Sequence, residues 1–545
     1  MSENIRTLTH LKDLDLNDIK GYETTFYSIA LEAWRRGINV KFINNNRAKA
    51  VVSYELNYKG KSHLFVSSRG DLTSRETMAI CRNKFKAKQY LRAANVPTPE
   101  GELFNENTDD QEIINYAIQK GFPVVIKPVD GQGGRGVISN IQNEKEFQEA
   151  LKYVRYELNY KKIIVEDYFP GKDLRVYVVD GEVIAITKRI PANVVGDGKS
   201  SIEKLIREKN KMRKKNPVLT SSLIKINSEL ITQLEYQNLN LKSVPNKNKR
   251  IYLQSKNNVS AGGDPIDVTD NISDEIKKIA IEAVEAIPGL VNAGVDLMVD
   301  LERNKATVLE INTQASIRTH LFPLEGEPRD IPKKIIDYYF PETKGIKINQ
   351  KIYFEFSNVW KLFRSGKVQE FKLPTISPNM TQMKFTVIGK VQFANYGTWV
   401  RRQARNYNLH GYFKHKRKNA AEIVVMGEHE SLNIFKEIIK TQDSKLSKVT
   451  EVIEMKCSEP IKAGFRVLTP ELDRQLIDGY YPKRIEGLSK LRRQQSIKDN
   501  SKQKTQDNKY KEQLEKVLNS NSWKITSPLR KFSNLARKIK RKIVG

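Results

Sequence analysis

The stretch Phe122–Ile141, FPVVIKPVDGQGGRGVISNI, decides the fold. Its β-branched run, Val124–Ile126, favours a strand that ends at Lys127, where a proline that cannot donate a ladder hydrogen bond follows. Four of the seven residues in Asp130–Gly136 are glycines, and Val137–Ile141 returns to an extended pattern. The stretch therefore predicts a strand, a glycine-rich loop and a second strand.

A glycine-rich loop beside a lysine suits anion binding. Backbone N–H groups at Gly131, Gly133, Gly134 and Gly136 can approach an anion closely because no Cβ atom intervenes, and Lys127 supplies a point charge. The alternative is a flexible hairpin loop with a chance lysine. The loop is not a GxxxxGK[ST] phosphate loop, because no Lys-Ser/Thr pair follows its last glycine. We predict a hairpin that covers phosphate groups.

Length and cysteine content limit the class of protein. The chain has 545 residues, 39% of them hydrophobic, which predicts three or four domains at roughly 100–200 residues each. Cys81 and Cys457 provide neither a disulfide framework nor a zinc-binding spacing, and this fits a reducing cytosol. The N-terminus is polar, and no stretch approaches the roughly 18 apolar residues of a membrane span. We therefore expect a cytoplasmic protein, soluble or peripheral at the inner membrane face.

The formal net charge of +30 is compatible with nucleic acid, a membrane surface or a polyanionic substrate. No recognised nucleic-acid-binding motif is present, so we expect no nucleic-acid partner. Residues Lys199–Lys256 are rich in Lys and Asn and contain a predicted helix, Ile202–Lys215. We predict that they form a basic cover over the site, although a charged stretch of this kind is also typical of simple solvation.

A second chemical centre lies on two predicted strands, GVDLMVD ending at Asp300 and VLEIN ending at Asn312. Glu310 and Asn312 are two residues apart and so point to the same face, and Asp296 belongs to the preceding, antiparallel strand. Three oxygen side chains on one face suit Mg²⁺, which bridges substrate phosphates. The alternative is that the acids are merely exposed, but apolar neighbours indicate that the opposite face is buried.

Six ordered blocks then resemble ATP-grasp ligases, most closely those of the cyanophycin-synthetase and bifunctional glutathione-synthetase kind. They are FPVVIKPVDGQGGRGV, VEDYFPGKDLRVYVVDGEVIA, KRIPANVVGDG, SAGGDPIDVTD, AGVDLMVD and LEINTQASIRTHLFP, across residues 81–341. The resemblance implies ATP and Mg²⁺ (or Mn²⁺) as cofactors. It also implies attack of a carboxylate on the γ-phosphate, followed by displacement of phosphate from the acyl phosphate by an amine.

The resemblance assigns roles to residues at matching positions. Lys84 and Lys127 contact ATP phosphates under the hairpin, Glu166 contacts the nucleoside, and the two acids and the asparagine hold the metal ion. Two arginines face the acyl phosphate or the substrate carboxylate, and a turn and a histidine shape the acceptor pocket. These last residues are Arg175, Arg189, Ser260, Gly262, Gly263 and His320.

The chain departs from the family after the metal strand. Where the family has Asn-Ala-x-Pro-Gly, this chain has Asn312-Thr-Gln-Ala-Ser316, so the family's substrate cannot be transferred to it. The sequence favours a ligase that acts on a small-molecule amino acid or peptide. Two alternatives stay open: a non-catalytic, ATP-binding scaffold for envelope assembly, and an acyl-phosphate hydrolase.

The pattern over Gln382–Leu468 is strand, helix, strand, strand, helix, strand, which resembles acylphosphatase, a ferredoxin-like α/β sandwich. Tyr396-Gly397 replaces the Phe-Arg of the family's phosphate loop, Phe393 replaces a loop glycine, and His415 replaces the catalytic asparagine. Without the arginine the phosphoryl group has no clamp, so we predict a non-hydrolytic remnant that binds or docks.

The C-terminal tail is basic. Leu529–Gly545 contains seven Lys/Arg and no acid, with apolar residues at helical spacing, which predicts an amphipathic helix for an anionic membrane surface or for a partner protein. Ser520–Arg530 resembles a terminal motif of bacterial surface-polysaccharide glycosyltransferases, which suggests the envelope glycan machinery as a partner. The predicted α/β organisation is an N-terminal region (1–80), an ATP-grasp domain (81–345), a connector (346–381), an acylphosphatase-like domain (382–468), a linker (469–510) and the tail (511–545).

Overall fold

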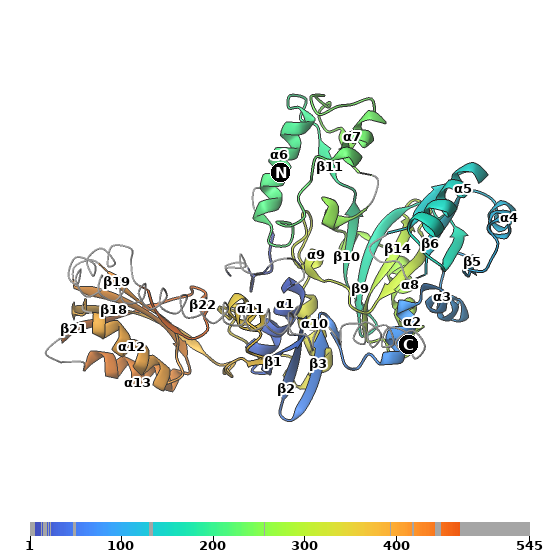
Figure 1. Ribbon diagram of the computed structural model, residues 1–545. Helices are drawn as coiled ribbons and strands as arrows, with labels where there is room; N and C mark the ends of the chain where they lie inside the picture. Colours follow the sequence, from blue (N-terminus) through green and yellow to red (C-terminus); the bar gives the residue numbers. More distant parts are fainter. Residues whose placement is uncertain are drawn as a thin grey trace, which may run out of the picture. The chain divides into compact units, whose positions relative to one another are not determined.

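Figure 1 shows the computed structural model of the chain. The structure describes residues 6–468, apart from 12–13, 15–18, 20, 22, 47–50, 130–134, 255–256, 393, 417–418 and 442–447. The predicted linker (469–510) and basic tail (511–545) lie outside the described residues. Within the described part, no helix is long and apolar enough to span a bilayer.

The N-terminal region is an antiparallel sheet that packs against helix α1 (Glu23–Arg35). The predicted connector contributes its fifth strand, because β17 pairs with β1. Connector aromatics also pack in its core, where the Phe26 and Phe356 rings are 4.8 Å apart. The sheet runs β17 (Glu370–Lys372), β1 (Asn39–Asn46), β2 (Val51–Tyr58), β3 (Lys61–Val66) and β4 (Arg69–Gly70).

The glycine-rich stretch lies in a small antiparallel sheet, as predicted. Its central strands are buried on both sides, and helices α4 (Asp110–Lys120) and α5 (Glu144–Lys152) supply much of its core. The strand order is β5 (Gly101–Phe104), β8 (Ile163–Asp167), β6 (Val124–Pro128) and β7 (Ile138–Ile141).

A larger antiparallel sheet carries the second chemical centre (Figure 1). Helices α2 (Arg75–Arg82), α3 (Lys84–Ala93) and α8 (Asp274–Glu285) contribute apolar side chains to the core on one of its faces. The short helices α9 (Arg318–Leu321) and α10 (Ile331–Tyr339) contribute to the core on the other. The strand order is β13 (Asp264–Asp267), β10 (Glu182–Ile190), β9 (Lys172–Val179), β14 (Asn292–Asp300) and β15 (Lys305–Asn312).

The predicted basic cover is a folded subdomain with its own apolar core. Ser201 caps its first helix by accepting a hydrogen bond from the Lys204 N–H, and the helix has the predicted bounds. The elements are α6 (Ile202–Lys215), α7 (Ser228–Glu235) and the two-stranded sheet of β11 (Asn193–Val195) and β12 (Arg250–Tyr252).

The C-terminal domain confirms the predicted ferredoxin-like order. Its four main strands lie in the order β21-β18-β20-β19, with helix α12 after the first strand and α13 after the third. The elements are β18 (Thr381–Lys390), α12 (Ala394–Asn406), β19 (His410–Lys416), β20 (Ala420–Gly427), α13 (His429–Lys440) and β21 (Lys448–Lys456).

Candidate active site

Three buried charged side chains meet between the small sheet and helix α3. The Lys127 ammonium, at the end of β6, donates to Glu166 Oε1 on β8 at 2.6 Å. The Lys88 ammonium, from α3, donates to the other carboxylate oxygen and to the Pro99 carbonyl, the latter at 3.1 Å. Exposed fractions are 3% for Lys88, 6% for Lys127 and 2% for Glu166. Two cations therefore share one carboxylate in the protein interior.

With both lysines protonated, the cluster carries one positive charge more than Glu166 neutralises. Burial, followed by repulsion from Lys127, lowers the pKa of the Lys88 ammonium to about 7. Burial acts to raise the pKa of Glu166, but Lys127 and Lys88 outweigh it and hold that pKa below its ordinary value. An uncompensated cation in a desolvated place favours an anionic ligand. The chemistry of a triphosphate fits it.

Sequence analysis missed Lys88 and selected Lys84, one helical turn earlier on α3. The Lys84 ammonium lies 3.7 Å from Glu310 Oε1, with its side chain 11% exposed. A signal was present, since lysines four residues apart share one face of a helix. The predicted nucleoside contact of Glu166 stays a prediction, because both of its carboxylate oxygens accept from lysines in this structure.

The predicted arginines converge on one carboxylate of the large sheet. Asp296 lies opposite Arg175 in the β14–β9 register, and the guanidinium donates to both carboxylate oxygens, to Oδ2 at 2.9 Å. The Arg189 guanidinium lies 3.2 Å from Asp296 Oδ1 and donates to Asp173 Oδ1 at 3.0 Å. Asp173 is a further site residue that the sequence analysis did not select.

Burial and charge compete within this group. Burial acts to raise the pKa of Asp296, but Arg175 and Arg189 dominate and lower it, so the carboxylate is ionised at neutral pH. Burial, with repulsion from Asp296, raises the pKa of Asp173 despite the contact with Arg189. Burial acts to lower the pKa of Arg189, but Asp296 and Asp173 outweigh it and raise that pKa. Arg189 therefore stays charged, and its contacts with Asp173 and Asp296 fix its direction.

The predicted metal ligands have suitable donor chemistry. Asp296 pairs with Glu310 across β14 and β15, and the Asn312 amide lies 3.5 Å from Asp296 Oδ2. Two carboxylates and an amide oxygen are hard donors of the kind that Mg²⁺ takes. Within the described residues, no group of three or more His, Cys, Asp or Glu side chains is arranged to hold a metal ion. The cations Arg175 and Lys84 occupy the carboxylates here, so metal binding by this set stays a prediction.

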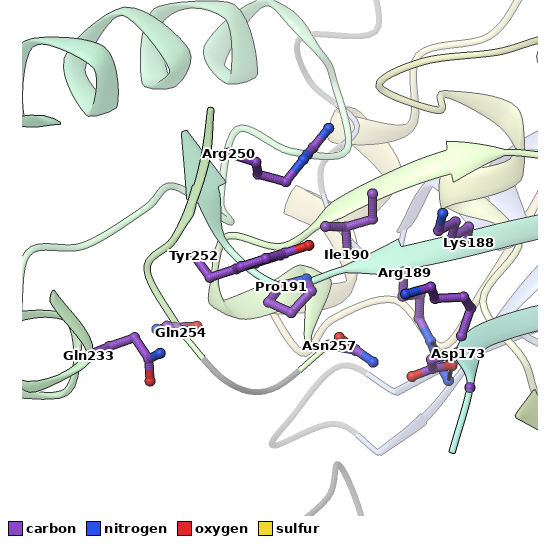
Figure 2. A pocket seen from close by; sticks show the side chains of 12 residues that line it. Asp173, Lys188, Arg189, Ile190, Pro191, Gln233, Arg250, Tyr252, Gln254 and Asn257 are labelled. Carbon is purple, nitrogen blue, oxygen red and sulfur yellow. Dashed lines mark hydrogen bonds and ion pairs between the residues drawn. The ribbon is translucent and has the colours of Figure 1, made fainter. Parts of the chain in front are cut away.

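A cavity of about 480 Å³ adjoins Arg189 (Figure 2). It lies between the ends of β9 and β10 and the covering subdomain. Its lining mixes apolar and polar groups and includes four basic side chains, one carboxylate and one aromatic ring. The lining residues are Gly171, Lys172, Asp173, Lys188, Arg189, Ile190, Pro191, Gln233, Arg250, Tyr252, Gln254 and Asn257.

The residues predicted to shape an acceptor pocket do not line this cavity. Ser260 ends up in a short 3₁₀ turn, with Gly262 in the left-handed region behind it. Gly263 has no room for a side chain, since a Cβ would lie 2.7 Å from the Ile190 carbonyl oxygen. His320 is 1% exposed and shares a 2.8 Å hydrogen bond with Thr187. Burial, then Arg175 and Arg189, lower the pKa of His320 to about 3, so its imidazole is neutral.

The hairpin loop is only partly described. Gly131, Gly133 and Gly134 lie outside the described residues. Gly136 adopts a φ of +76°, and a Cβ there would approach the Tyr160 ring to 3.1 Å. Glycine is therefore required at this position, while phosphate contact by the loop stays a prediction.

In the C-terminal domain, the residues that differ from the acylphosphatase pattern lie on helix α12 and strand β19. Gly397 lies in the first turn of α12, where the phosphate-binding arginine is expected, and His415 lies near the end of β19 with its ring 4.7 Å from that of Phe413. Tyr396 is buried, and its ring packs against Phe413 as well. These contacts contribute to the core of the domain. That the domain does not hydrolyse acyl phosphates stays a prediction.

Two family models and several curated proteins match parts of this chain. The family model of the RimK-like ATP-grasp domain matches residues 81–212, and that of acylphosphatase matches residues 383–467. Cyanophycin synthetase from Synechocystis sp. is 33% identical over 355 residues, 64% of this chain and 40% of that protein. The glutathione biosynthesis bifunctional protein GshAB from Clostridium perfringens is 31% identical over 345 residues, 61% of this chain and 43% of that protein.

A solved bifunctional glutathione synthetase from Pasteurella multocida is 26% identical, with a TM-score of 0.45, over 58% of this chain and 45% of its own. The chain spans less than half the length of each of these three relatives. The first family match includes all four strands of the small sheet, and the second includes the sheet β21-β18-β20-β19 and its two helices. The chain therefore contains an ATP-grasp domain and, after it, an acylphosphatase-like domain.

Proposed function

We propose that the protein is an ATP- and Mg²⁺-dependent carboxylate–amine ligase that forms an amide bond through an acyl phosphate. The observation that carries this proposal is the buried cluster in which Lys88 and Lys127 share the single carboxylate of Glu166. Its surplus positive charge suits a triphosphate, and the carboxylates of the large sheet suit the accompanying metal ion.

In the first step, one oxygen of the substrate carboxylate attacks the γ-phosphorus and ADP leaves. In the second, the amine nitrogen attacks the acyl carbon, inorganic phosphate leaves and the nitrogen loses a proton. The metal ion, when bound by Asp296, Glu310 and Asn312, would neutralise phosphate charge. Arg175 and Arg189 are the residues of this chain that would hold the reacting carboxylate and the transferring phosphoryl group, because their guanidinium groups are oriented by Asp296 and Asp173.

The substrates in this proposal are small: an amino acid or peptide as one partner and an amine as the other. We further propose that the protein works on the cytoplasmic side of the membrane and acts near the envelope glycan machinery through its basic tail. The acylphosphatase-like domain has no assigned hydrolytic role, because Gly397 supplies no cation where the family has its arginine.

The test is ADP release by the purified full chain with Mg²⁺-ATP and each amino acid in turn, in L and D forms, with mass spectrometry of any product. Release that depends on one amino acid, and that is lost in Glu310→Ala and Lys127→Ala, is the expected result. Glu102→Ala, an exposed carboxylate of the small sheet, is the matched control and should behave as wild type. ATP binding without any amino-acid-dependent release would favour the scaffold alternative, and release of phosphate from an added acyl phosphate alone would favour the hydrolase.

A further inference from the structure

The cavity beside Arg189 contains cations that the fold does not neutralise. Lys172, Lys188 and Arg250 line it, and among the described residues no carboxylate lies within ion-pairing distance of any of the three. Arg250 donates to the Asn193 amide oxygen at 2.8 Å, which orients the guanidinium but does not offset its charge. Positive charges gathered without a counterion raise the energy of the empty site, and an anion would lower it.

The nearby acids have other partners. Asp173, which also lines the cavity, accepts from Arg189. Asp264, behind the cavity, is 2% exposed and is shared between the Arg213 guanidinium, at 3.0 Å, and the Lys209 ammonium. Each of these carboxylates is therefore already matched by at least one cation, and neither can compensate the three lining cations.

The position of Lys188 supports the same conclusion. Figure 2 shows Lys188 and Arg189 at adjacent positions of β10, with their side chains on opposite sides of the strand, and Arg250 and Tyr252 on β12 of the covering subdomain. Burial lowers the pKa of Lys188, and repulsion from Lys172 and Arg250 lowers it further, with no acid acting in the opposite direction. Charge of one sign thus accumulates across the cavity, from the sheet to the cover.

We propose that this cavity is a subsite for a second anionic group of the substrate, a carboxylate or phosphate, held by Lys188 and Arg250 while the reacting carboxylate lies at Arg189. The proposal rests on the proposed ligase function and specifies its substrate class: a molecule with at least two anionic groups. The amide side chains of Gln233, Gln254 and Asn257, which also line the cavity, supply further hydrogen-bond donors and acceptors. Tyr252, with 42% of its surface exposed, supplies an apolar wall.

The rival source of negative charge is the nucleotide itself, whose phosphates share the same chemistry. Experiment can distinguish the two sources. If the cavity binds the nucleotide, substitution of its cations should lower the affinity for nucleotide; if it binds the substrate, nucleotide affinity should stay unchanged. Binding can be measured by calorimetry on the full chain, first with Mg²⁺-AMP-PNP alone and then, at saturating Mg²⁺-AMP-PNP, with small carboxylates. Succinate, glutarate and adipate are compared with butyrate, valerate and hexanoate, which match them in length but carry one carboxylate.

The expected result is that at least one dicarboxylate binds roughly tenfold or more tightly than the monocarboxylate of the same length, because its second carboxylate gains a charge-assisted hydrogen bond. Lys188→Gln and Arg250→Gln should each remove most of that preference and leave the AMP-PNP affinity within about twofold of wild type. Lys211→Gln is the control, because it removes the same charge from an exposed position of the same subdomain, outside the cavity.

Three outcomes would overturn the proposal: equal affinities for the paired acids, no measurable binding of either, or a loss of AMP-PNP affinity in Lys188→Gln with the dicarboxylate preference intact. None of these readouts requires turnover, so a failure of amide formation remains distinguishable from a failure of the subsite. If dicarboxylates bind and ADP release is never seen, the subsite stands and the ligase proposal falls.

Discussion

Substitution of Glu166 by glutamine tests the surplus-charge argument most directly. Glu166→Gln keeps the shape and the hydrogen-bonding oxygen but leaves Lys88 and Lys127 buried without a carboxylate. Removing one partner of a buried ion pair costs about 3–5 kcal/mol. At pH 7.5 Lys88 is already largely neutral, because burial and Lys127 lower its pKa to about 7, so the substitution leaves one further charge without its partner. From the ordinary lysine pKa of about 10.5, removing one lysine proton at pH 7.5 costs about 4 kcal/mol, at about 1.4 kcal/mol for each pH unit, which agrees with the first figure.

The assay is thermal unfolding of the full chain, followed through the transition that contains the ATP-grasp domain. At about 2–4 °C per kcal/mol for a domain of this size, Tm should fall by about 6–20 °C at pH 7.5. The loss should shrink at pH 9, where deprotonating a lysine costs only about 2 kcal/mol. Glu102→Gln, an exposed acid of the same sheet, should shift Tm by no more than about 1 °C. A shift in Glu166→Gln no larger than that of Glu102→Gln, or one that grows with pH, would refute the reasoning.

Three further predictions concern other parts of the site. Burial and Lys127 lower the pKa of Lys88 from 10.5 to about 7, so between these pH values the unfolded chain binds one proton more than the folded chain, and the free energy of unfolding should rise with pH. Lys88→Met should flatten this pH dependence in urea titrations, and an unchanged slope would contradict the assignment. A lysine at position 189 cannot keep contacts to both Asp173 and Asp296, so in the proposed ligase Arg189→Lys should lower kcat on the order of a hundredfold with little change in the KM for ATP. A kcat within twofold of wild type would exclude the proposed role. Gly263→Ala places a Cβ 2.7 and 2.8 Å from two backbone carbonyl oxygens, so calorimetry should find the domain destabilised by about 1–3 kcal/mol. An unaltered Tm would show that the turn shifts to accommodate the methyl group without a measurable cost.

Local pattern was sufficient for most of the fold. The predicted helix Ile202–Lys215 has the observed bounds, because Ser201 caps its N-terminus with a side-chain oxygen and such a cap is visible in the sequence. The strand and helix order of the C-terminal domain followed in the same way from alternation of apolar residues. The predicted connector did not reveal that its short strand β17 completes the N-terminal sheet, since pairing between residues more than 300 positions apart has no local signature.

The residue types of the site could be recognised from the sequence: Lys127 and Glu166 near the ends of two strands, a pair of arginines, and acids on neighbouring strands. Which of these charges meet depends on the tertiary structure. Lys88 looks like any solvated helix residue until α3 packs against β8, and Asp173 looks exposed until Arg189 lies beside it. Whether a charge is neutralised depends on burial and on partners that come from distant segments, so the surplus cations of the cluster and of the cavity are properties of the folded chain.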